Sequence, residues 1–459
     1  MPRIPGLLVF ALLVGGCAAP QPGEQPSPAR AVPIKGAKLQ DDVNGDGFSD
    51  LVFQIADSGL PRMAIVYGSR DGLTPAENTV IPAKRFTPWI IDAGIQADLD
   101  GDGYGDIVAF GGHPGGDERG LPRVYWGDRA GIGPEDTAVP IVPPTFAQSS
   151  VYRAVTGDFD GDGAADVAMA TPEGTVTAPE GTVATPEGTV TAPEGTVTAP
   201  EGTVTASEGT VAAPEGTSGD TSSKPALELL YGPFDRNAKP ARRAKMPSPT
   251  GGEFWRMAVD RTGSWPTGLL VFEADDGEQT SGWLLSGRLG GPAAQGRKLN
   301  PGMAAAFGDF DGDGTRDVAV GDDGSRNDEP GFESEPPGVD DTLTVYYGNG
   351  REKRFTGAKG RAVATDLDGD GHDDLLVGAA PGGSSSETAK GGVRVYRGAQ
   401  DGLPAGEILA GALGEPLAAG DYNGDGHGEV VLSHGEGGKH TISVTDGERI
   451  LTTFTTDQL

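Results

Sequence analysis

The chain has a single cysteine, few positive charges for its size and no long apolar run. One cysteine in 459 residues excludes an intrachain disulfide and a zinc site built from several thiolates. Only 35 Lys and Arg stand against 67 Asp and Glu, which gives a formal net charge of −32. A chain this acidic repels a phosphate backbone, so we expect neither nucleic-acid binding nor docking on an anionic bilayer through a basic face. No apolar run reaches the roughly 18 residues of an ordinary transmembrane helix.

Signatures of common catalytic sites are also missing. The sequence has no G-x-S-x-G nucleophile motif and no phosphate-binding Walker loop. Of its five histidines, His372 and His427 lie inside acidic repeats described below. No motif links His113, His434 or His440 to a nucleophile or to a pair of carboxylates.

The first residues are typical of an export signal. A short cationic start at 1–3 precedes the apolar stretch 6–14. The following Val14-Gly15-Gly16-Cys17 resembles a bacterial lipobox, whose cysteine receives diacylglycerol. The alternative is an ordinary signal peptide cut after Ala19. The lipobox is favoured because Pro20 would hinder that cut and the one cysteine sits where lipidation needs it.

We therefore expect a lipoprotein signal peptide at 1–16, a lipidated Cys17 and a Pro-rich tether at 17–32. Two acyl chains are enough for stable anchoring, so the membrane contact would be made through the lipid alone. The protein would be exported and either lipid-anchored to the outer face of the bacterial cell membrane or secreted.

Glycine and proline make up about a quarter of the chain, and the glycines recur with a period. One pattern, D-x-[DN]-x-D-G-x-x-[DE], occurs at 42–50, 98–106, 158–166, 309–317, 366–374 and 421–429. A decayed seventh copy fits 260–268, where Thr262, Ser264 and Gly268 replace acids. Without one insertion, the copies start about 55 residues apart, so seven units account for nearly the whole mature chain.

The insertion, residues 171–219, consists of near-identical heptads of the type Ala-Pro-Glu-Gly-Thr-Val-Thr. Two interpretations stay open. The heptads are either a disordered tract expanded by slippage or a Thr/Pro-rich stalk or docking arm that could carry O-glycans.

Each intact copy, called an acidic loop below, gathers hard oxygen donors in a short turn. Positions 1, 3 and 5 bring carboxylate or amide oxygens to one point, and glycine at position 6 allows the sharp turn. Position 7 offers a backbone carbonyl and the acid at position 9 closes the shell. Such a set suits Ca²⁺ better than zinc or copper. An EF-hand is excluded, because position 12 is apolar in every copy and each loop runs into a strand-like stretch such as 317–320.

The residues around the loops predict the architecture. We interpret the apolar residue at position 2 as a plug that pins the loop onto the strand pair beneath it; these residues are Val43, Leu99, Phe159, Phe310, Leu367 and Tyr422. Each acidic loop is then the turn of a hairpin formed by the first two strands of a unit. Third strands are expected at 63–67, 122–126, 227–231, 283–285, 343–347, 393–396 and 441–444, each followed by a weaker fourth.

Seven such units predict an all-β fold: a seven-bladed β-propeller with four antiparallel strands per blade, which removes exposed sheet edges by radial closure. The blades are expected at about 33–86, 87–146, 147–249, 250–299, 300–357, 358–411 and 412–459.

The alternation of these loops with Gly378-Ala-Ala-Pro381 and Val395-Tyr396-x-Gly398 resembles the FG-GAP (VCBS-type) repeat of integrin α-subunit propellers and secreted bacterial proteins. The resemblance covers about 33–459. It implies a structural Ca²⁺ in the first hairpin of six blades, with none in the loop at 260–268. The implied ligands are Asp42, Asn44, Asp46, Phe48, Asp50, Asp98, Asp100, Asp102, Tyr104, Asp106, Asp158, Asp160, Asp162, Ala164, Asp166, Asp309, Asp311, Asp313, Thr315, Asp317, Asp366, Asp368, Asp370, His372, Asp374, Asp421, Asn423, Asp425, His427 and Glu429, with the position-7 residues acting through their backbone carbonyls.

The loops between second and third strands open on the opposite face, and the long ones include 111–120, 321–330 and 382–391. In integrin-like propellers this is the ligand-binding face. We expect a non-catalytic adhesion or ligand-binding module for an extracellular protein or glycan. The alternative is a propeller enzyme, a lyase or hydrolase acting on extracellular polysaccharide or lipid. A cluster of His, Tyr, Arg and acid at the central channel would favour the enzyme.

The anchor gives the first prediction. The mature protein should start at Cys17 and partition into detergent, and Cys17→Ala should release it into the aqueous phase. The measurement is N-terminal mass spectrometry with detergent phase separation. A membrane-bound Cys17→Ala protein, or a mature start at Pro20, would show that the lipoprotein interpretation is wrong.

Overall fold

The structure is a computed structural model that describes residues 39–55, 62–82, 95–111, 121–141, 154–171, 225–260, 266–274, 279–325, 339–378, 392–436 and 439–459. The expected signal peptide, tether and Cys17 lie outside the described residues, as does the insertion beyond Thr171. In the described part of the chain, no helix has the length and hydropathy of a membrane span.

The described residues form seven antiparallel sheets, called blades 1 to 7 in chain order. Blades 1 to 3 are β1 (Leu51–Ile55), β2 (Arg62–Val66) and β3 (Asn78–Ile81); β4 (Gln96–Ala97), β5 (Asp106–Gly111), β6 (Leu121–Tyr125) and β7 (Val139–Pro140); β8 (Ala154–Gly157), β9 (Asp166–Thr171), β10 (Ala226–Tyr231) and β11 (Arg242–Pro247). Blades 4 and 5 are β12 (Phe254–Val259), β13 (Leu269–Glu273), β14 (Ser281–Leu285) and β15 (Arg297–Pro301); β16 (Ala304–Gly308), β17 (Asp317–Gly321), β18 (Thr342–Tyr346) and β19 (Glu352–Thr356). Blades 6 and 7 are β20 (Arg361–Thr365), β21 (Asp374–Gly378), β22 (Arg394–Tyr396) and β23 (Glu407–Ile408); β24 (Glu415–Gly420), β25 (Glu429–Glu436), β26 (Lys439–Thr445) and β27 (Ile450–Thr455), followed by the 3₁₀ helix η3 (Thr456–Gln458).

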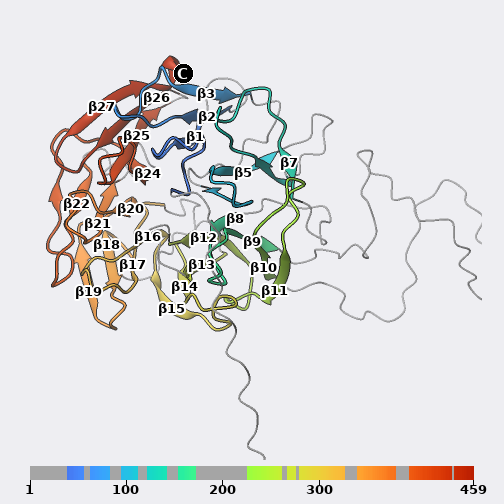
Figure 1. The fold of residues 1–459 in the computed structure, drawn as a ribbon. Helices are drawn as coiled ribbons and strands as arrows, with labels where there is room; N and C mark the ends of the chain where they lie inside the picture. Colours follow the sequence, from blue (N-terminus) through green and yellow to red (C-terminus); the bar gives the residue numbers. More distant parts are fainter. Residues whose placement is uncertain are drawn as a thin grey trace, which may run out of the picture.

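In every blade each strand pairs with the next one along the chain, and the sheets follow one another around a ring (Figure 1). The chain is therefore an all-β, seven-bladed propeller, as predicted. Six blades have four strands, and blade 1 has three among the described residues. Residues 39–41, directly before its acidic loop, are not in a strand, and the chain before them lies outside the described residues.

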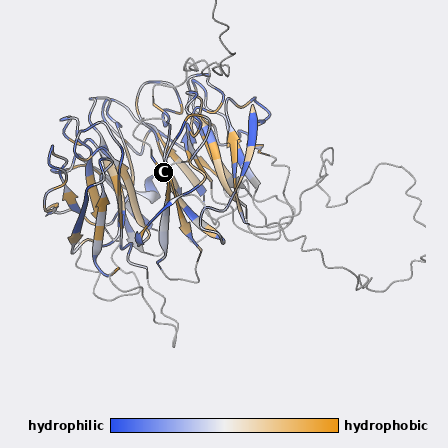
Figure 2. Ribbon diagram, turned by 90° about the horizontal axis from the view of Figure 1, so that it is seen from below, coloured by the Kyte–Doolittle hydropathy of each residue, from blue (hydrophilic) through white to orange (hydrophobic). Residues whose placement is uncertain are grey.

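Burial decreases from the second strand of a blade to the fourth. The apolar run that follows each acidic loop forms the second strand, and all five residues of β17 and of β21 are buried. The fourth strand carries charge: β19 is almost wholly exposed. Figure 2 shows apolar colour on the strands of the blades. Two-sided burial explains why the second strands read as continuous apolar runs while the fourth strands are hard to detect in the sequence.

The ring closes between blade 7 and blade 1. Leu51 and Phe53 of β1 pack in one cluster with Ile442 of β26 and Phe454 of β27. Figure 1 likewise shows β1–β3 next to β24–β27. This seam, defined as the junction of blades 7 and 1, joins the two ends of the propeller by side-chain packing and by the loop contacts described below.

The local predictions agree with these elements. A strand lies at each expected third-strand position, and the six position-2 residues are all buried, at 0–3% exposure. The predicted plugs therefore do anchor the loops in the hydrophobic core. β15 ends at Pro301, two residues beyond the expected end of the fourth blade.

Candidate metal centres

Each acidic loop is folded by its own carboxylates. In blade 2, the Asp98 carboxylate accepts hydrogen bonds from the backbone N–H groups of Gly101 (2.8 Å), Asp102 (3.1 Å) and Gly103 (3.0 Å). Gly101 and Gly103 have φ of 75° and 99°, which disfavours other residues there. The sequence therefore sets the turn and the direction of the acids together.

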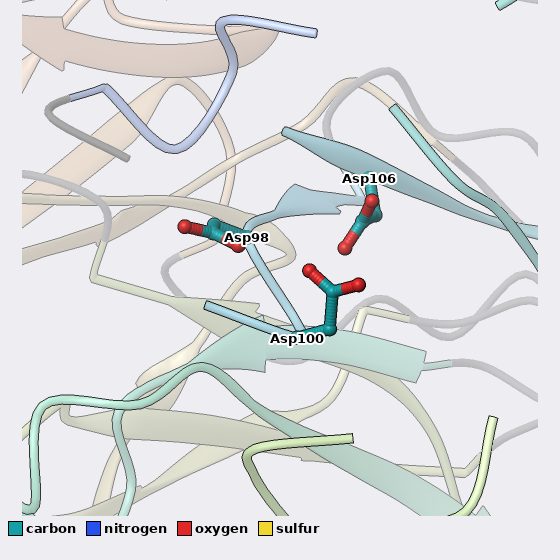
Figure 3. A group of neighbouring side chains, drawn as sticks. All are labelled: Asp98, Asp100 and Asp106. Atoms are coloured by element: carbon teal, nitrogen blue, oxygen red, sulfur yellow. The ribbon is translucent and has the colours of Figure 1, made fainter. Parts of the chain in front are cut away.

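Five of the six loops bring three acids to one point, with one oxygen from each within 4.8 Å of the others. Figure 3 shows this arrangement for blade 2. The groups are Asp98, Asp100 and Asp106; Asp158, Asp160 and Asp166; Asp309, Asp311 and Asp317; Asp366, Asp368 and Asp370; Asp421, Asp425 and Glu429. Three of the predicted ligands therefore converge in each of these loops. The position-5 acid is one of the three only in blades 6 and 7.

The sixth acidic loop, in blade 1, and the decayed loop of blade 4 differ. In blade 1, Asn44 stands at position 3, and no such group of three acids is found among its described residues. The decayed loop of blade 4 lies partly outside the described residues, which include Asp260 and 266–268 but not Thr262 or Ser264. The prediction that blade 4 holds no metal therefore stays a prediction.

The donor atoms suit a hard cation. In blade 5, Asp309 Oδ1 and Asp311 Oδ1 are buried without a hydrogen-bond partner. Buried carboxylate oxygens without partners are costly in a folded protein. A divalent ion held by oxygen ligands would satisfy both atoms. The residues present in this loop therefore fit a metal ion.

The acid at position 9 also has a structural role that the sequence analysis missed. In blade 2, Asp106 Oδ2 accepts the N–H of Leu99 and Oδ1 accepts the N–H of Gly127, both at 2.9 Å. Asp50, Asp166 and Asp317 make the same two bonds in their blades. A Cβ at Gly127 would lie 2.3 Å from the carbonyl oxygen of Gly105, so the backbone approach requires glycine. The glycine that follows the third strand in these four blades was the sequence signal for this clamp.

Burial perturbs these acids strongly. Desolvation raises the pKa of Asp50, Asp106 and Asp166 to about 8 and that of Asp317 and Glu429 to about 7. The backbone N–H bonds lower the pKa but do not offset burial, and neighbouring loop acids raise it further. A metal ion would have to displace protons from these groups.

The acidic loops also join the blades. The N–H of position 8 donates to the position-1 carbonyl of the preceding blade: Gly105 to Asp42 at 2.6 Å and Gly428 to Asp366 at 2.8 Å. The seam uses the same bond, from Ser49 N–H to Asp421 O at 3.0 Å. The loops are thus part of the blade-to-blade contact.

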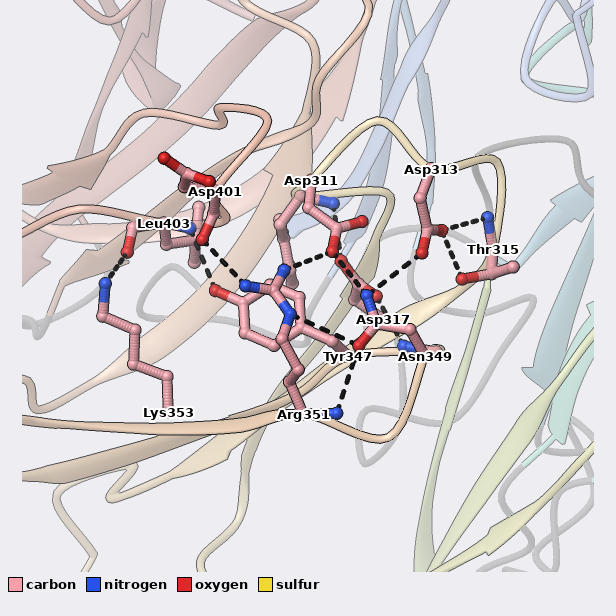
Figure 4. Close-up of polar contacts among 12 residues, drawn as sticks. Asp311, Asp313, Thr315, Asp317, Tyr347, Asn349, Arg351, Lys353, Asp401 and Leu403 are labelled. Carbon is pink, nitrogen blue, oxygen red and sulfur yellow. Dashed lines mark hydrogen bonds and ion pairs between the residues drawn. The ribbon is translucent and has the colours of Figure 1, made fainter.

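Arginines from the fourth strands, or from the connections that precede them, lie on the position-3 acids, which the sequence analysis did not predict. Arg236 Nε lies 2.6 Å from Asp100 Oδ2, and Arg242 Nη2 lies 2.7 Å from Asp160 Oδ2. Figure 4 shows the blade 5 example, in which Arg351 reaches Asp311 at 2.5 Å. No sequence signal marks these residues, because their spacing from the loops varies.

These features define a class of protein: a β-propeller in which most blades begin with an acidic loop whose carboxylates could hold a metal ion. The FG-GAP-like repeat family model matches residues 98–169 and 366–432. The chain is therefore a β-propeller that carries FG-GAP-like repeats. A search of curated proteins finds no match.

Solved structures with a related arrangement include three rhamnogalacturonan lyases. YesW is 12% identical, with 86% of this chain and 70% of that chain covered and a TM-score of 0.29. The PL11 lyase of Bacillus licheniformis is 12% identical, with 92% and 70% covered and a TM-score of 0.33. YesX is 14% identical, with 86% and 72% covered and a TM-score of 0.28. Likeness at this level says nothing of the activity of this chain.

The raised pKa values predict how the chelated protein responds to pH. The folded protein keeps protons on the position-9 acids that the unfolded chain releases above about pH 4. Their contribution to stability is therefore largest at low pH and is lost as pH rises through about 7 to 8. In excess chelator, the melting temperature should fall between pH 6 and pH 9. Saturating divalent ion should weaken this fall. A flat or rising profile in chelator would contradict the burial of these acids.

Proposed function

We propose that this protein is a cell-surface, calcium-binding β-propeller that acts as a non-catalytic adhesion or ligand-binding module for an extracellular protein or glycan. Calcium is structural in the proposal. It holds the acidic loops, and through them the blades, in one arrangement. The lipid on Cys17 would keep the module at the outer face of the cell.

Calcium is supported by the donor set. The five groups consist of aspartates and one glutamate, so their donors are carboxylate oxygens, and Oδ1 of Asp309 and Oδ1 of Asp311 are buried without a hydrogen-bond partner. Two carboxylates about 4 Å apart repel by roughly 4 kcal/mol at an effective dielectric of 20. Ca²⁺ accepts six to eight oxygens in flexible geometry, whereas Mg²⁺ demands a tighter octahedron.

The observation that carries the binding function is that the two faces of the propeller carry different loops. The acidic loops occupy one face, where their backbone groups are already engaged between blades. The loops between second and third strands begin and end on the other face, for example after Gly321 of β17 and before Thr342 of β18. Long connections held by a rigid ring are a common way to present a binding surface.

The placement of the histidines that the structure describes gives no specific support to catalysis. In blade 7, His440 Nδ1 lies 3.3 Å from Ser433 Oγ across neighbouring strands. His372 instead approaches the acidic loop of the preceding blade, since a Cβ at Gly312 would lie 2.7 Å from its ring. We therefore retain the non-catalytic proposal.

Calcium dependence is the first test. Titration calorimetry of the metal-free protein should find close to six sites, and Asp102→Ala or Asp313→Ala should each remove one. Chelation should lower the melting temperature strongly, because metal bound only by the folded state stabilises it, and Mg²⁺ should rescue poorly. Ser264→Ala is the matched control and should change neither quantity. A stoichiometry of zero or one, or melting that is indifferent to chelator, would contradict the calcium proposal.

Ligand binding is the second test. The calcium-loaded protein should be screened against glycan and extracellular-matrix arrays, with chelated protein and a 171–219 deletion in parallel. Saturable binding that calcium supports, without conversion of the ligand, is the expected result. Cleavage of the ligand, detected by mass spectrometry of the bound glycan, would instead favour the alternative function of a propeller enzyme. Binding lost only in the deletion would assign it to the heptads.

A further inference from the structure

The position-3 residue divides the six acidic loops into two kinds. It is an aspartate in blades 2, 3, 5 and 6 and an asparagine in blades 1 and 7. The members are Asp100, Asp160, Asp311 and Asp368 in the first group, and Asn44 and Asn423 in the second. Loops of the first group carry four acids at the side-chain positions, and loops of the second carry three.

Every four-acid loop has an arginine beside it. Arg236, Arg242 and Arg351 contact position 3 at 2.5–2.7 Å. Arg397 of blade 6 lies 2.9 Å from Asp374 Oδ2 and 4.0 Å from Asp368 Oδ2. These four-acid loops are called braced loops below.

Aromatic rings hold three of these guanidinium groups in place. Arg242 lies 3.5 Å from the centre of the Tyr231 ring, and Arg351 lies 4.4 Å from that of Tyr347. Arg236 similarly faces Trp126 at 5.1 Å. Each ring belongs to the residue just before the glycine that clamps position 9. A guanidinium stacked in this way is pre-organised for its carboxylate.

In the described part of the chain, the three-acid loops have no such cation beside them. Among the described residues, no lysine or arginine forms an ion pair with 42–50 or 421–429. The asparagine amide donates within the loop instead: Asn44 Nδ2 to Asp46 Oδ2 at 3.0 Å, and Asn423 Nδ2 to Glu429 Oε1 at 2.5 Å. Four acids with one arginine, and three acids alone, leave the same formal charge of about −3 for the ion to offset.

The brace also leaves an oxygen free for the ion. In blade 5, Arg351 contacts Oδ2 of Asp311, while Oδ1 of the same carboxylate is buried without a partner. The arginine can therefore stay in place when a cation binds, and it holds the carboxylate in the same orientation without one.

We propose that these arginines are positioning residues that keep the braced loops folded without calcium, so that calcium controls mainly the two unbraced loops on either side of the seam. The proposal rests on the calcium part of the proposed function. The unbraced loops meet where the chain closes its ring, through Ser49 and Asp421. Loss of calcium would then loosen this one joint first, and the other blade contacts would persist.

Hydrogen-exchange mass spectrometry of the full chain, with calcium and with excess chelator, tests the proposal. Peptides covering 42–50 and 421–429 should exchange about tenfold faster or more after chelation, and the peptide covering 309–317 should change much less. This comparison uses the wild-type protein, so it does not depend on the folding of a variant. Equal acceleration in all six loops would overturn the proposal while leaving calcium binding intact. No acceleration anywhere would overturn the calcium proposal as well.

A substitution tests the arginine directly. Arg351→Gln should make the 309–317 peptide as sensitive to chelator as the seam peptides. Arg297→Gln is the matched control, because Arg297 also faces a tyrosine ring, that of Tyr346 at 5.0 Å, but pairs with Glu352 outside the loops. If the two variants respond alike, the brace has no specific effect on the loop and the proposal is wrong.

Discussion

The propeller depends on one electrostatic constraint: at most of its blade junctions, several carboxylates must lie within a few ångströms of one another. Three acids converge within 4.8 Å in five loops, and the backbone of the same loops bonds to the neighbouring blade. The neutralisation of these acids therefore takes place next to the contacts that join the blades. Protons, arginines and a divalent ion can all do so, each over a different range of conditions.

The clamp at position 9 shows how closely the loop and the blade are coupled. One carboxylate links the plug residue, the turn and the glycine that follows the third strand, as Asp106 does with Leu99 and Gly127. Its burial keeps the turn in register with the strands, and it also makes the carboxylate costly to ionise. The loop therefore organises the blade through the same carboxylate whose raised pKa makes it sensitive to pH.

The architecture could be predicted because its signals are local and repeat. A loop such as 309–317 contains its glycine, its acids and its plug Phe310 within nine residues, and the buried strand follows at once. Contacts between distant residues could not be predicted in this way. Arg236 reaches Asp100 from another blade, 136 residues further along the chain, and nothing near either residue marks the pair. The opposite face was beyond sequence reasoning as well, since the shape of a long loop depends on packing more than on local pattern.

The ladder between second and third strands has a consequence for how this fold can change. In blade 3, Thr171 and Ala226 face each other as the last pair of the β9–β10 ladder, although 54 residues separate them. The pair fixes the two ends of the connection at one distance whatever its length, and closure entropy grows only slowly with loop length. The connection between the second and third strands of a blade can therefore accept an inserted sequence without a change in the core of that blade. A propeller of this kind can gain a new surface by insertion in one blade, while the remaining blades keep their register.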